Sequence, residues 1–374
     1  MLRRIFSSIF FLLNILVVVW LCCCIVAAYT DPLTTKYIAL FSLTLPFAIL
    51  ANVIFIIMWL FSAHKWRAIL SVLVLVGGYK VTTTVFAFNI FTDNDMSRKP
   101  RTIKIVSWNS HGMGVFNKPV SKAFDRKIID FLQEQDADIL CMPEYSLTID
   151  NILKPYAEKI IQNSGYTDYR FQADNSLNDK IYLGTAVFSK YPFRNYEAHQ
   201  LSEYIYMLQG DVVLPENKVI RVFFVHLTTF GLSDKEKDYI DDVQRSADSV
   251  KGAIKRSRQF MDKLNVAYEN RAAEVNKAVK IIKKSPYPVL LCGDFNDLPG
   301  SYTYTTMRGN LKDAFLEKGT GFGRTYNRLS PTIRIDHFFY DDSVLRLIGF
   351  ECPATELSDH NPIITNFEIV GTRP

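Results

Sequence analysis

The 374-residue chain lacks the cysteine pattern of a disulfide-stapled or zinc-bound module. Its six cysteines include no Cys-x-x-Cys pair and no cysteine–histidine spacing of the kind that zinc sites use. Three of them, residues 22–24, lie inside an apolar run. Cys141 and Cys292 each end a hydrophobic run, so we expect buried free thiols.

Acidic residues are nearly absent from the first 90 residues, which contain one acid, Asp31, and six lysines and arginines. The remaining residues hold 37 basic and 37 acidic side chains, so the net charge of +5 comes from the N-terminal part. This balance indicates no broad basic surface, and a nucleic-acid partner would need a local basic patch. The hydrophobic content of 48% excludes a disordered or collagen-like chain.

Two uncharged runs, residues 5–29 and 37–63, each exceed the about 20 residues that span a bilayer. We expect both to be transmembrane helices. A third apolar run, residues 68–90, contains Lys80, and a lysine at the bilayer centre costs roughly 2.5–3.5 kcal/mol. We expect it to span as well. A cleaved signal peptide is the alternative for the first run, but that run is too long and a second span follows it.

Cations in short loops predict the orientation of these spans. Basic residues at 3–4 and at 65–67 place those ends in the cytoplasm. Three spans then put the chain after residue 90 in the periplasm of a bacterium, with the inner membrane as the location and the lipid bilayer as a partner. Four cations between residues 98 and 104 count against this orientation, and without the third span the large domain would be cytoplasmic.

After residue 90 the composition turns polar, which predicts a linker over residues 91–100 and a domain over residues 101–370. In the domain, strand-like and helix-like stretches alternate, which predicts an α/β fold with helices covering stacked sheets. One polar segment, residues 231–250, is expected to be a loop or lid. The predicted strands are 103–108, 138–142, 183–189, 205–214, 219–227, 288–293, 335–340 and 363–369, and the predicted helices are 124–135 and one long helix before residue 288.

Polar residues recur where the predicted strands end, and such residues converge in space. A hard cation such as Mg²⁺ prefers carboxylate and carbonyl oxygens, so Glu144 and Asp359 with the amide of Asn109 would suit it. Histidines beside such an ion can protonate a leaving oxygen or hold a phosphoryl oxygen.

Six short motifs occur in order along the chain: Trp108-Asn109, Pro143-Glu144, Val225-His226-Leu227, Gly293-Asp294-Phe295-Asn296-Asp297, Arg334-Ile335-Asp336 and Ser358-Asp359-His360-Asn361-Pro362. Together they resemble the motifs of the endonuclease/exonuclease/phosphatase superfamily. Any one of them is weak evidence, but six in register are specific. The resemblance covers roughly residues 101–370. It implies a four-layered α/β/β/α sandwich, here preceded by a transmembrane segment at residues 1–90, that cleaves phosphate esters with a divalent cation.

The resemblance implies a metal site at Glu144, supported by Asn109 and Asp359, that takes Mg²⁺ or, as the other option, Mn²⁺. It implies that His226 donates a proton to the leaving oxygen. Apurinic endonucleases use other residues at the position of His226, so a base-excision repair enzyme is the poorer choice.

The other motif residues act on water and phosphate if the resemblance holds. Asp294 would orient or deprotonate the attacking water, and Asn296 would hold that water or a phosphate oxygen. Asp336 and His360 would form an oriented imidazolium that steadies the scissile phosphate.

Several polar residues outside the motifs have a structural alternative. His111, His199 and His337 pair with no motif, so we expect structural roles for them. Arg271 lies near the apolar face of the long helix, where it either binds substrate phosphate or extends along the protein surface.

The sequence therefore predicts a membrane-anchored, metal-dependent phosphoesterase that hydrolyses a phosphodiester or phosphomonoester. A membrane lipid is the favoured substrate, because the domain is tethered at a bilayer and carries no net basic charge. An extracytoplasmic endonuclease or exonuclease on DNA or RNA is the alternative. A non-catalytic module that binds a phosphate ligand is a third hypothesis, against which the complete set of motif residues argues.

Overall fold

The computed structural model describes residues 2–114, 122–148, 160, 164–178, 181–230, 250–328 and 330–370. The chain divides into two compact units. The first comprises Met1–Val85, Thr228–Ala273 and Leu298–Met307, and the second comprises Phe86–Leu227, Glu274–Asp297 and Arg308–Pro374.

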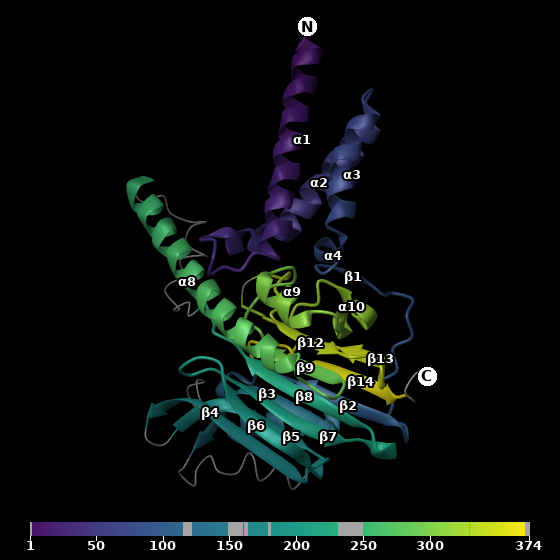
Figure 1. Cartoon of the computed structure of the whole chain (residues 1–374), viewed down its shortest axis with the longest axis vertical. Coiled ribbons are helices and arrows are strands. Elements are labelled where there is room, and N and C mark those ends of the chain that lie inside the picture. The colour runs from purple at the N-terminus through teal and green to yellow at the C-terminus, as the bar shows by residue number, and fades with distance from the viewer. Residues whose placement is uncertain are drawn as a thin grey trace. The chain divides into compact units, whose positions relative to one another are not determined.

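Two six-stranded sheets form the second unit (Figure 1). One has the strand order β13-β14-β2-β3-β5-β4 and the other β10-β12-β9-β8-β7-β6. The first consists of β2 (Thr102–Ser107), β3 (Ile139–Thr148), β4 (Asp168–Asn178), β5 (Ile181–Ser189), β13 (Leu345–Glu351) and β14 (Ile363–Ile369). The second consists of β6 (Phe193–Gln200), β7 (Tyr206–Val213), β8 (Val219–His226), β9 (Val289–Asp294), β10 (Lys312–Asp313) and β12 (Asp336–Tyr340).

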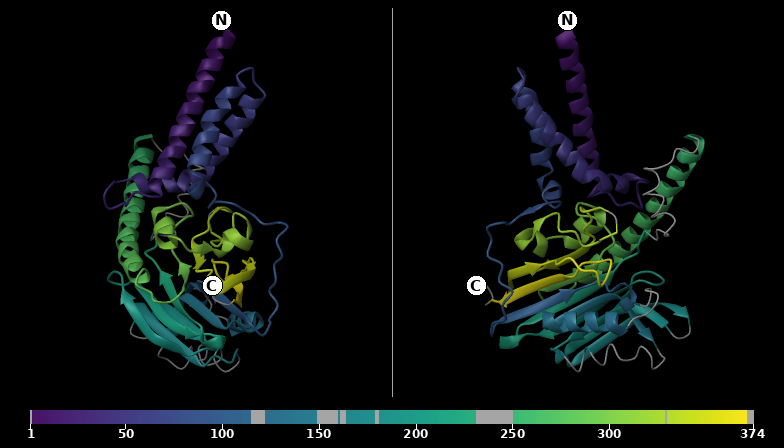
Figure 2. Two further views of the ribbon diagram at one scale, coloured as in Figure 1. Left: turned by 45° about the vertical axis from the view of Figure 1, so that its right-hand side comes forward. Right: turned by 180° about the vertical axis from the view of Figure 1, so that it is seen from behind.

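The two sheets pack face to face (Figure 2), and a cluster of buried apolar side chains joins them. Ile105 of β2 and Ile139 of β3 belong to one buried cluster with Phe224 of β8 and Leu290 of β9. A second cluster joins the other face of the first sheet to α5 (Lys122–Gln135), with Ile128 among its buried residues. The long helix α8 (Val250–Ile282) enters this unit at Glu274. The predicted four-layered α/β/β/α sandwich is confirmed.

Four strands of these two sheets were not predicted from the sequence, and each of them lies at an edge of its sheet. β4, β6, β10 and β13 have one neighbour each in the strand order. An edge strand faces solvent along one side, so it carries polar residues and lacks a continuous apolar run. The segment FRNYEAHQ of β6 has this character, with exposed side chains at several positions.

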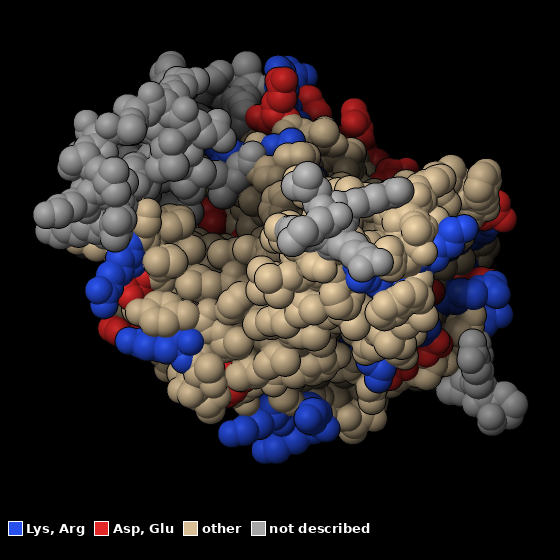
Figure 3. All heavy atoms as spheres, turned by 90° about the horizontal axis from the view of Figure 1, so that it is seen from above, with Lys and Arg blue, Asp and Glu red and all other residues tan. Residues whose placement is uncertain are grey.

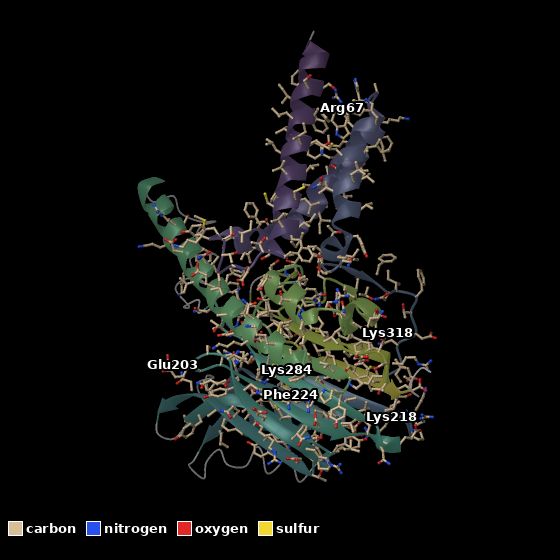
Figure 4. All side chains as sticks on the ribbon, viewed as in Figure 1. Arg67, Glu203, Lys218, Phe224, Lys284 and Lys318 are labelled. Carbon is tan, nitrogen blue, oxygen red and sulfur yellow. The ribbon has the colours of Figure 1, made fainter. Side chains whose placement is uncertain are left out.

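The N-terminal helices of the first unit are α1 (Leu2–Ala27), α2 (Leu45–Leu60), α3 (Ala68–Gly77) and α4 (Tyr79–Thr82), with a 3-10 turn η1 (Ile38–Thr44) before α2. Buried polar side chains tie them together, because Asn14 donates to Ser71 Oγ at 2.8 Å and accepts from Trp59 Nε1 at 2.9 Å. Arg67, labelled in Figure 4, donates to the Ser7 carbonyl at 3.0 Å.

Two helical segments in the described part of the chain, Phe6–Ala27 and Ile38–Leu60, are long and apolar enough to cross a membrane. The third expected span, residues 68–90, differs from the prediction. Its helix breaks at Gly77 and Gly78 and ends at Thr82. The backbone of Gly78 lies so close to Ile25 that a Cβ atom there would meet the Ile25 side chain at 2.2 Å, so the break accommodates close packing against α1.

The predicted linker makes hydrogen bonds to the second unit. Within residues 91–100, the Asp95 N–H donates to the Ile348 carbonyl at 2.9 Å. Asn366 of β14 donates to the carbonyls of Asp95 and Ser97 at 3.0 and 2.9 Å. The predicted loop or lid at residues 231–250 lies, except for Val250, outside the described residues.

Candidate active site

Three strands of the second sheet bring His226, Asp294 and Asp336 into one row. β8 ends at His226, which pairs with Asp294 at the end of parallel β9. Asp294 in turn pairs with Asp336 at the start of antiparallel β12. Residues paired across neighbouring strands project on the same face of a sheet, so a histidine and two acids face one side.

Asn109 links this row to the first sheet. It follows β2 and is fully buried, and its Nδ2 donates to Asp294 Oδ2 at 2.9 Å and to Glu144 Oε1 at 3.0 Å. Its Oδ1 accepts the backbone N–H of His111 at 3.0 Å. In this arrangement the amide of Asn109 positions two carboxylates from different sheets.

A bulge in β3 presents Glu144 to the site. The pairing of β3 with β5 shifts register between Met142 and Tyr145, and Glu144 has a φ of 51°. Burial alone would raise the pKa of Glu144, but the imidazoles of His111 and His226 and the amide of Asn109 lower this pKa to about 2. Glu144 is therefore a carboxylate that faces several hydrogen-bond donors.

Asp359 presents a carboxylate oxygen that suits a cation. Its side chain is buried, and Oδ1 has no hydrogen-bond partner among the described residues. The Nδ1 of His111 lies 3.4 Å from Oδ1, and the Nε of Arg328 lies 3.7 Å from Oδ2. A buried carboxylate oxygen without a donor is costly unless a cation binds it, so Asp359 fits a metal ligand.

His360 is held by a buried carboxylate. Its Nδ1 lies 2.8 Å from Asp336 Oδ2, its Nε2 lies 3.8 Å from Asp294 Oδ2, and its carbonyl accepts from Trp108 Nε1 at 2.9 Å. Burial would lower the pKa of His360, but Asp336 and Asp294 outweigh burial and raise the pKa to about 10. The ring is an imidazolium at neutral pH.

His226 faces two other acids. Its Nε2 lies 3.7 Å from Glu144 Oε1, and its Nδ1 lies 3.9 Å from Asp174 Oδ2 on β4. Burial would lower the pKa of His226, but Asp174, Asp294 and Glu144 outweigh burial and raise the pKa to about 9. His226 thus also carries a proton at neutral pH.

Asp294 and Asn296 form a tight turn at the end of β9. The Asn296 N–H donates to Asp294 Oδ1 at 2.8 Å, and Asn296 Nδ2 donates to the Leu227 carbonyl at 2.8 Å. Burial and the neighbouring carboxylate of Asp336 raise the pKa of Asp294 above its usual value. A carboxylate with a raised pKa is a better proton acceptor.

The structure brings together eight of the nine predicted site residues, all in the second unit: Asn109, Glu144, His226, Asp294, Asn296, Asp336, Asp359 and His360. Arg271, the ninth, belongs to the first unit. There its guanidinium stacks on Phe230 and Tyr268, 4.1 and 4.7 Å from the ring centroids, and donates to the Thr228 carbonyl at 2.9 Å. Arg271 is thus buried against aromatic rings in the first unit rather than extended along the protein surface, and its binding of substrate phosphate stays a prediction.

Two site residues were missed from the sequence. His111 was assigned a structural role, yet its Nδ1 lies 3.5 Å from Glu144 Oε2 and 3.4 Å from Asp359 Oδ1. Its position two residues after Asn109, before a glycine, is the sequence signal that could have found it. Asp174 follows no motif and lies in an edge strand that was not predicted. His337 is structural, as expected: it is buried, and its Nε2 lies 2.9 Å from the Asp297 carbonyl.

Two groups of side chains bring possible ligand atoms within 4.8 Å of one another: Glu144 with His226 and Asp294, and Asp294 with Asp336 and His360. Because both histidines carry a proton, the carboxylates are the members of these groups that suit a divalent cation. A pocket of about 500 Å³ opens beside Asp359. His111, Arg324, Asn327, Arg328, Thr355, Glu356 and Ser358 are among the residues that line it.

Comparison with known proteins identifies the fold family. The family model described as Endonuclease/Exonuclease/phosphatase family matches residues 106–360, which is more than half of the chain. The chain belongs to this family. A second family model, a domain of unknown function (DUF8431), matches residues 7–85.

Two solved structures share the family fold. A family protein from Beutenbergia cavernae is 17% identical, with a TM-score of 0.53 over 73% of this chain and 72% of that chain. A family protein from Bacteroides thetaiotaomicron is 18% identical, with a TM-score of 0.50 over 73% of this chain and 100% of that chain.

A "UPF0294 protein" of Vibrio campbellii is 27% identical over 104 residues, which are 28% of this chain and 36% of that relative. The match thus spans about a third of that curated relative's length.

Proposed function

We propose that this chain is a membrane-anchored, divalent-cation-dependent phosphoesterase that hydrolyses a phosphate ester by in-line attack of water. The observation that carries the proposal is the meeting of two sheets at one site. One sheet supplies the row of His226, Asp294 and Asp336, and the other supplies Glu144 on a bulge. Membership of the family supports phosphate-ester hydrolysis as the reaction.

The side chains divide the reaction among them. Asp294, with its raised pKa, accepts a proton from the attacking water, and Asn109 holds that carboxylate in place. His360, charged and oriented by Asp336, stabilises the negative charge that develops on the phosphoryl oxygens. His226 carries the proton that the leaving oxygen needs.

Glu144 and Asp359 are the residues that would hold the cation. When bound, the ion would supply Lewis-acid stabilisation of the phosphate charge. From oxygen ligands alone, Mg²⁺ is the expected ion and Mn²⁺ the other option. The buried Oδ1 of Asp359, which has no hydrogen-bond partner among the described residues, supports this assignment.

A lipid phosphate ester is the favoured substrate class. Two apolar helices, Phe6–Ala27 and Ile38–Leu60, would keep the domain at a bilayer, in our proposal the bacterial inner membrane with the domain in the periplasm. Residues 91–374 carry equal numbers of basic and acidic side chains. On the face shown in Figure 3, lysines and arginines lie in small separate groups rather than in one basic stripe.

One parallel assay tests this proposal. Purified full chain in detergent is given bis-p-nitrophenyl phosphate, phospholipid vesicles and DNA, each with Mg²⁺ or Mn²⁺, and Glu144→Gln serves as the matched control. We expect hydrolysis of the first two substrates, with the variant strongly reduced. Hydrolysis of DNA alone would favour the nuclease alternative. If wild type hydrolyses none of the substrates faster than Glu144→Gln, the remaining hypothesis is a non-catalytic module that binds a phosphate ligand.

A further inference from the structure

Large apolar side chains are exposed where the second unit begins in the sequence. On β1 (Ala87–Phe88), Ala87 is buried and Phe88 is 71% exposed, in line with the alternation of side chains along a strand. Phe91 is 92% exposed, and Phe86 packs edge-on against Phe322 with ring centroids 5.1 Å apart. Five exposed residues form this apolar patch: Phe86, Phe88, Ile90, Phe91 and Phe322.

Hydrogen bonds of the backbone hold the patch in the second unit. β1 pairs antiparallel with β11 (Thr320–Gly321), which directly precedes Phe322. Asn89 lies between the exposed residues, and its Nδ2 donates to the carbonyls of Leu316 and Gly319 at 2.9 Å each. Single exposed apolar residues are common on proteins, whereas a group of them marks a contact with a membrane or with another protein.

The place of the patch in the chain favours a bilayer as its partner. Phe86 follows the end of α4, at Thr82, by four residues, and α4 is the last helix of the proposed membrane segment. Exposed phenylalanine and other large apolar side chains bury themselves at the boundary between lipid head groups and acyl chains. The patch therefore has the residue types that a bilayer surface accepts, directly after the segment that would lie in the bilayer.

A basic pocket adjoins the patch. Its volume is about 660 Å³, and Ile90 of the patch is among its lining residues. The charged residues of its lining, in the part of the chain that the structure describes, are Arg324 and Lys318, the latter labelled in Figure 4. Both side chains donate to backbone carbonyls. Positive charge beside an apolar surface suits lipids, whose acidic phosphates lie next to apolar acyl chains.

The basic pocket also connects the patch with the candidate active site. Arg324, Asn327 and Ala354 line both this pocket and the pocket of about 500 Å³ beside Asp359. An apolar surface, a basic pocket and a candidate metal ligand are thus linked through shared lining residues. This link favours a lipid over a second copy of the chain, because a lipid carries both an apolar part for the patch and a phosphate for the site.

We propose that the apolar patch seats the catalytic unit on the surface of the bilayer, where lipid phosphate reaches the basic pocket. The inference rests on the membrane anchoring of the proposed function, and it adds the contact through which the second unit meets its substrate. Its consequence concerns the substrate class. A phosphate ester presented in a bilayer is hydrolysed in preference to a phosphate ester in solution.

Photo-crosslinking in the full chain tests which partner the patch meets. The photoreactive analogue p-benzoylphenylalanine takes the position of Phe88 or Phe91, and the chain is reconstituted in nanodiscs of phosphatidylethanolamine and phosphatidylglycerol. After illumination, mass spectrometry should find lipid adducts at both positions. The control is the analogue at Tyr204, an exposed aromatic residue in the turn between β6 and β7, at the edge of the second sheet opposite β10. It should give on the order of tenfold fewer lipid adducts.

The other partners give different products. Adducts to a second copy, adducts to another part of the same chain, or lipid adducts in equal yield at Tyr204 would overturn the proposal. Cross-linking does not require hydrolysis, so lipid adducts in a chain that hydrolyses no substrate would support the patch and count against the proposed function alone. Hydrolysis in a chain without lipid adducts would do the reverse.

Serine variants test the consequence for the substrate. Phe88→Ser combined with Phe91→Ser removes two exposed rings and leaves the motif residues in place. The ratio of phospholipid hydrolysis to bis-p-nitrophenyl phosphate hydrolysis should fall on the order of tenfold in the double variant, because less apolar surface is buried at the bilayer. Tyr204→Ser is the matched control and should keep the wild-type ratio. An unchanged ratio in the double variant would contradict a role of the patch in presenting lipid.

Discussion

His226 and His360 face the same carboxylate, Asp294, from different elements and are held in different ways. His360 lies 2.8 Å from Asp336, which sets its tautomer, whereas His226 lies 3.9 Å from Asp174 and 3.7 Å from Glu144. Both rings carry a raised pKa and are protonated at neutral pH. In the proposed mechanism, the less tightly held His226 gives its proton to the leaving group, and the fixed charge of His360 stabilises the phosphate.

The leaving group separates these two roles. A general acid contributes about 10²–10⁴-fold when the leaving oxygen is basic and little when it leaves readily. We therefore expect His226→Ala to cripple hydrolysis of an alkyl phosphodiester and largely spare a p-nitrophenyl ester. His360→Ala should reduce both, because charge develops on the phosphate whichever group departs. The measurement is kcat/KM for both substrates in each variant.

Asp336→Asn is the matched control for this experiment. It should resemble a weaker His360→Ala, since only the orientation and charge of that imidazole are affected. Equal losses on both substrates in His226→Ala would remove His226 from the general-acid role.

His337 gives a prediction about stability and pH. Burial and the charge of Arg334 lower the pKa of His337 to about 3, so the folded ring is neutral while an unfolded histidine titrates near 6.5. The unfolded chain therefore binds a proton below pH 6.5 that the folded chain excludes. Stability contributed by neutral His337 is lost as pH falls from 6.5 toward 3, by at most roughly 1.4 kcal/mol per pH unit.

The test compares wild type with His337→Gln in denaturant titrations of the full chain at pH 7, 5.5 and 4. The wild-type advantage should shrink as pH falls, because the variant lacks this titration. His199→Gln controls for loss of a histidine elsewhere. A wild-type advantage that stays constant over this pH range would show that His337 does not contribute.

Residue types at strand ends were sufficient to predict eight of the nine site residues as one group, because six motifs in order constrain one another. His111 escaped because its role depends on a left-handed turn, which no periodicity in the sequence indicates. Asp174 was not predicted as a site residue, because no motif or spacing in the sequence indicates that β4 lies near His226. Arg271 was ambiguous in the sequence because a helix face shows an arginine's position but not its stacking partners.

Among the elements, interior strands were predictable and edge strands were not. The predicted segment 219–227 matches β8 (Val219–His226), and the predicted segment 363–369 matches β14 exactly in extent. Both strands have a neighbour on each side in their sheet, and most of their residues are buried. The predicted linker before β2 makes hydrogen bonds to β13 and β14, which its polar composition does not indicate.

The break after α3 bears on the topology of the N-terminal region. α3 and α4 together cover Ala68–Thr82, a helical rise of about 22 Å against a hydrocarbon core of about 30 Å. Lys80 near the end of α4 can extend its amine to an interface. Cation placement still predicts that the chain crosses here and that the second unit lies outside the cytoplasm.

Reporter fusions after residue 95 test this prediction in cells. A reporter that is active only in the periplasm should be active there, and a cytoplasmic reporter at the same point should be silent. A fusion after residue 64, which follows α2, is the control and should give the reverse pattern. The cytoplasmic pattern at residue 95 would show that residues 68–90 do not cross the membrane.

At the scale of the whole molecule, one unit bears on the reaction and the other on its location. Family membership over residues 106–360 accounts for the fold and points to the reaction class. The apolar helices of the other unit bear on where the reaction takes place and on which substrates are within reach. The sequence could predict the family because its motifs involve many residues at once, whereas substrate identity depends on few residues.

Cation-dependent hydrolysis by the purified full chain is the most direct test of the central claim. We expect bis-p-nitrophenyl phosphate turnover that excess EDTA abolishes and Mg²⁺ or Mn²⁺ restores. Glu144→Gln, which removes one ligand charge at nearly constant size, should lower turnover by orders of magnitude with little change in thermal stability. Undiminished wild-type turnover in excess EDTA would contradict the account.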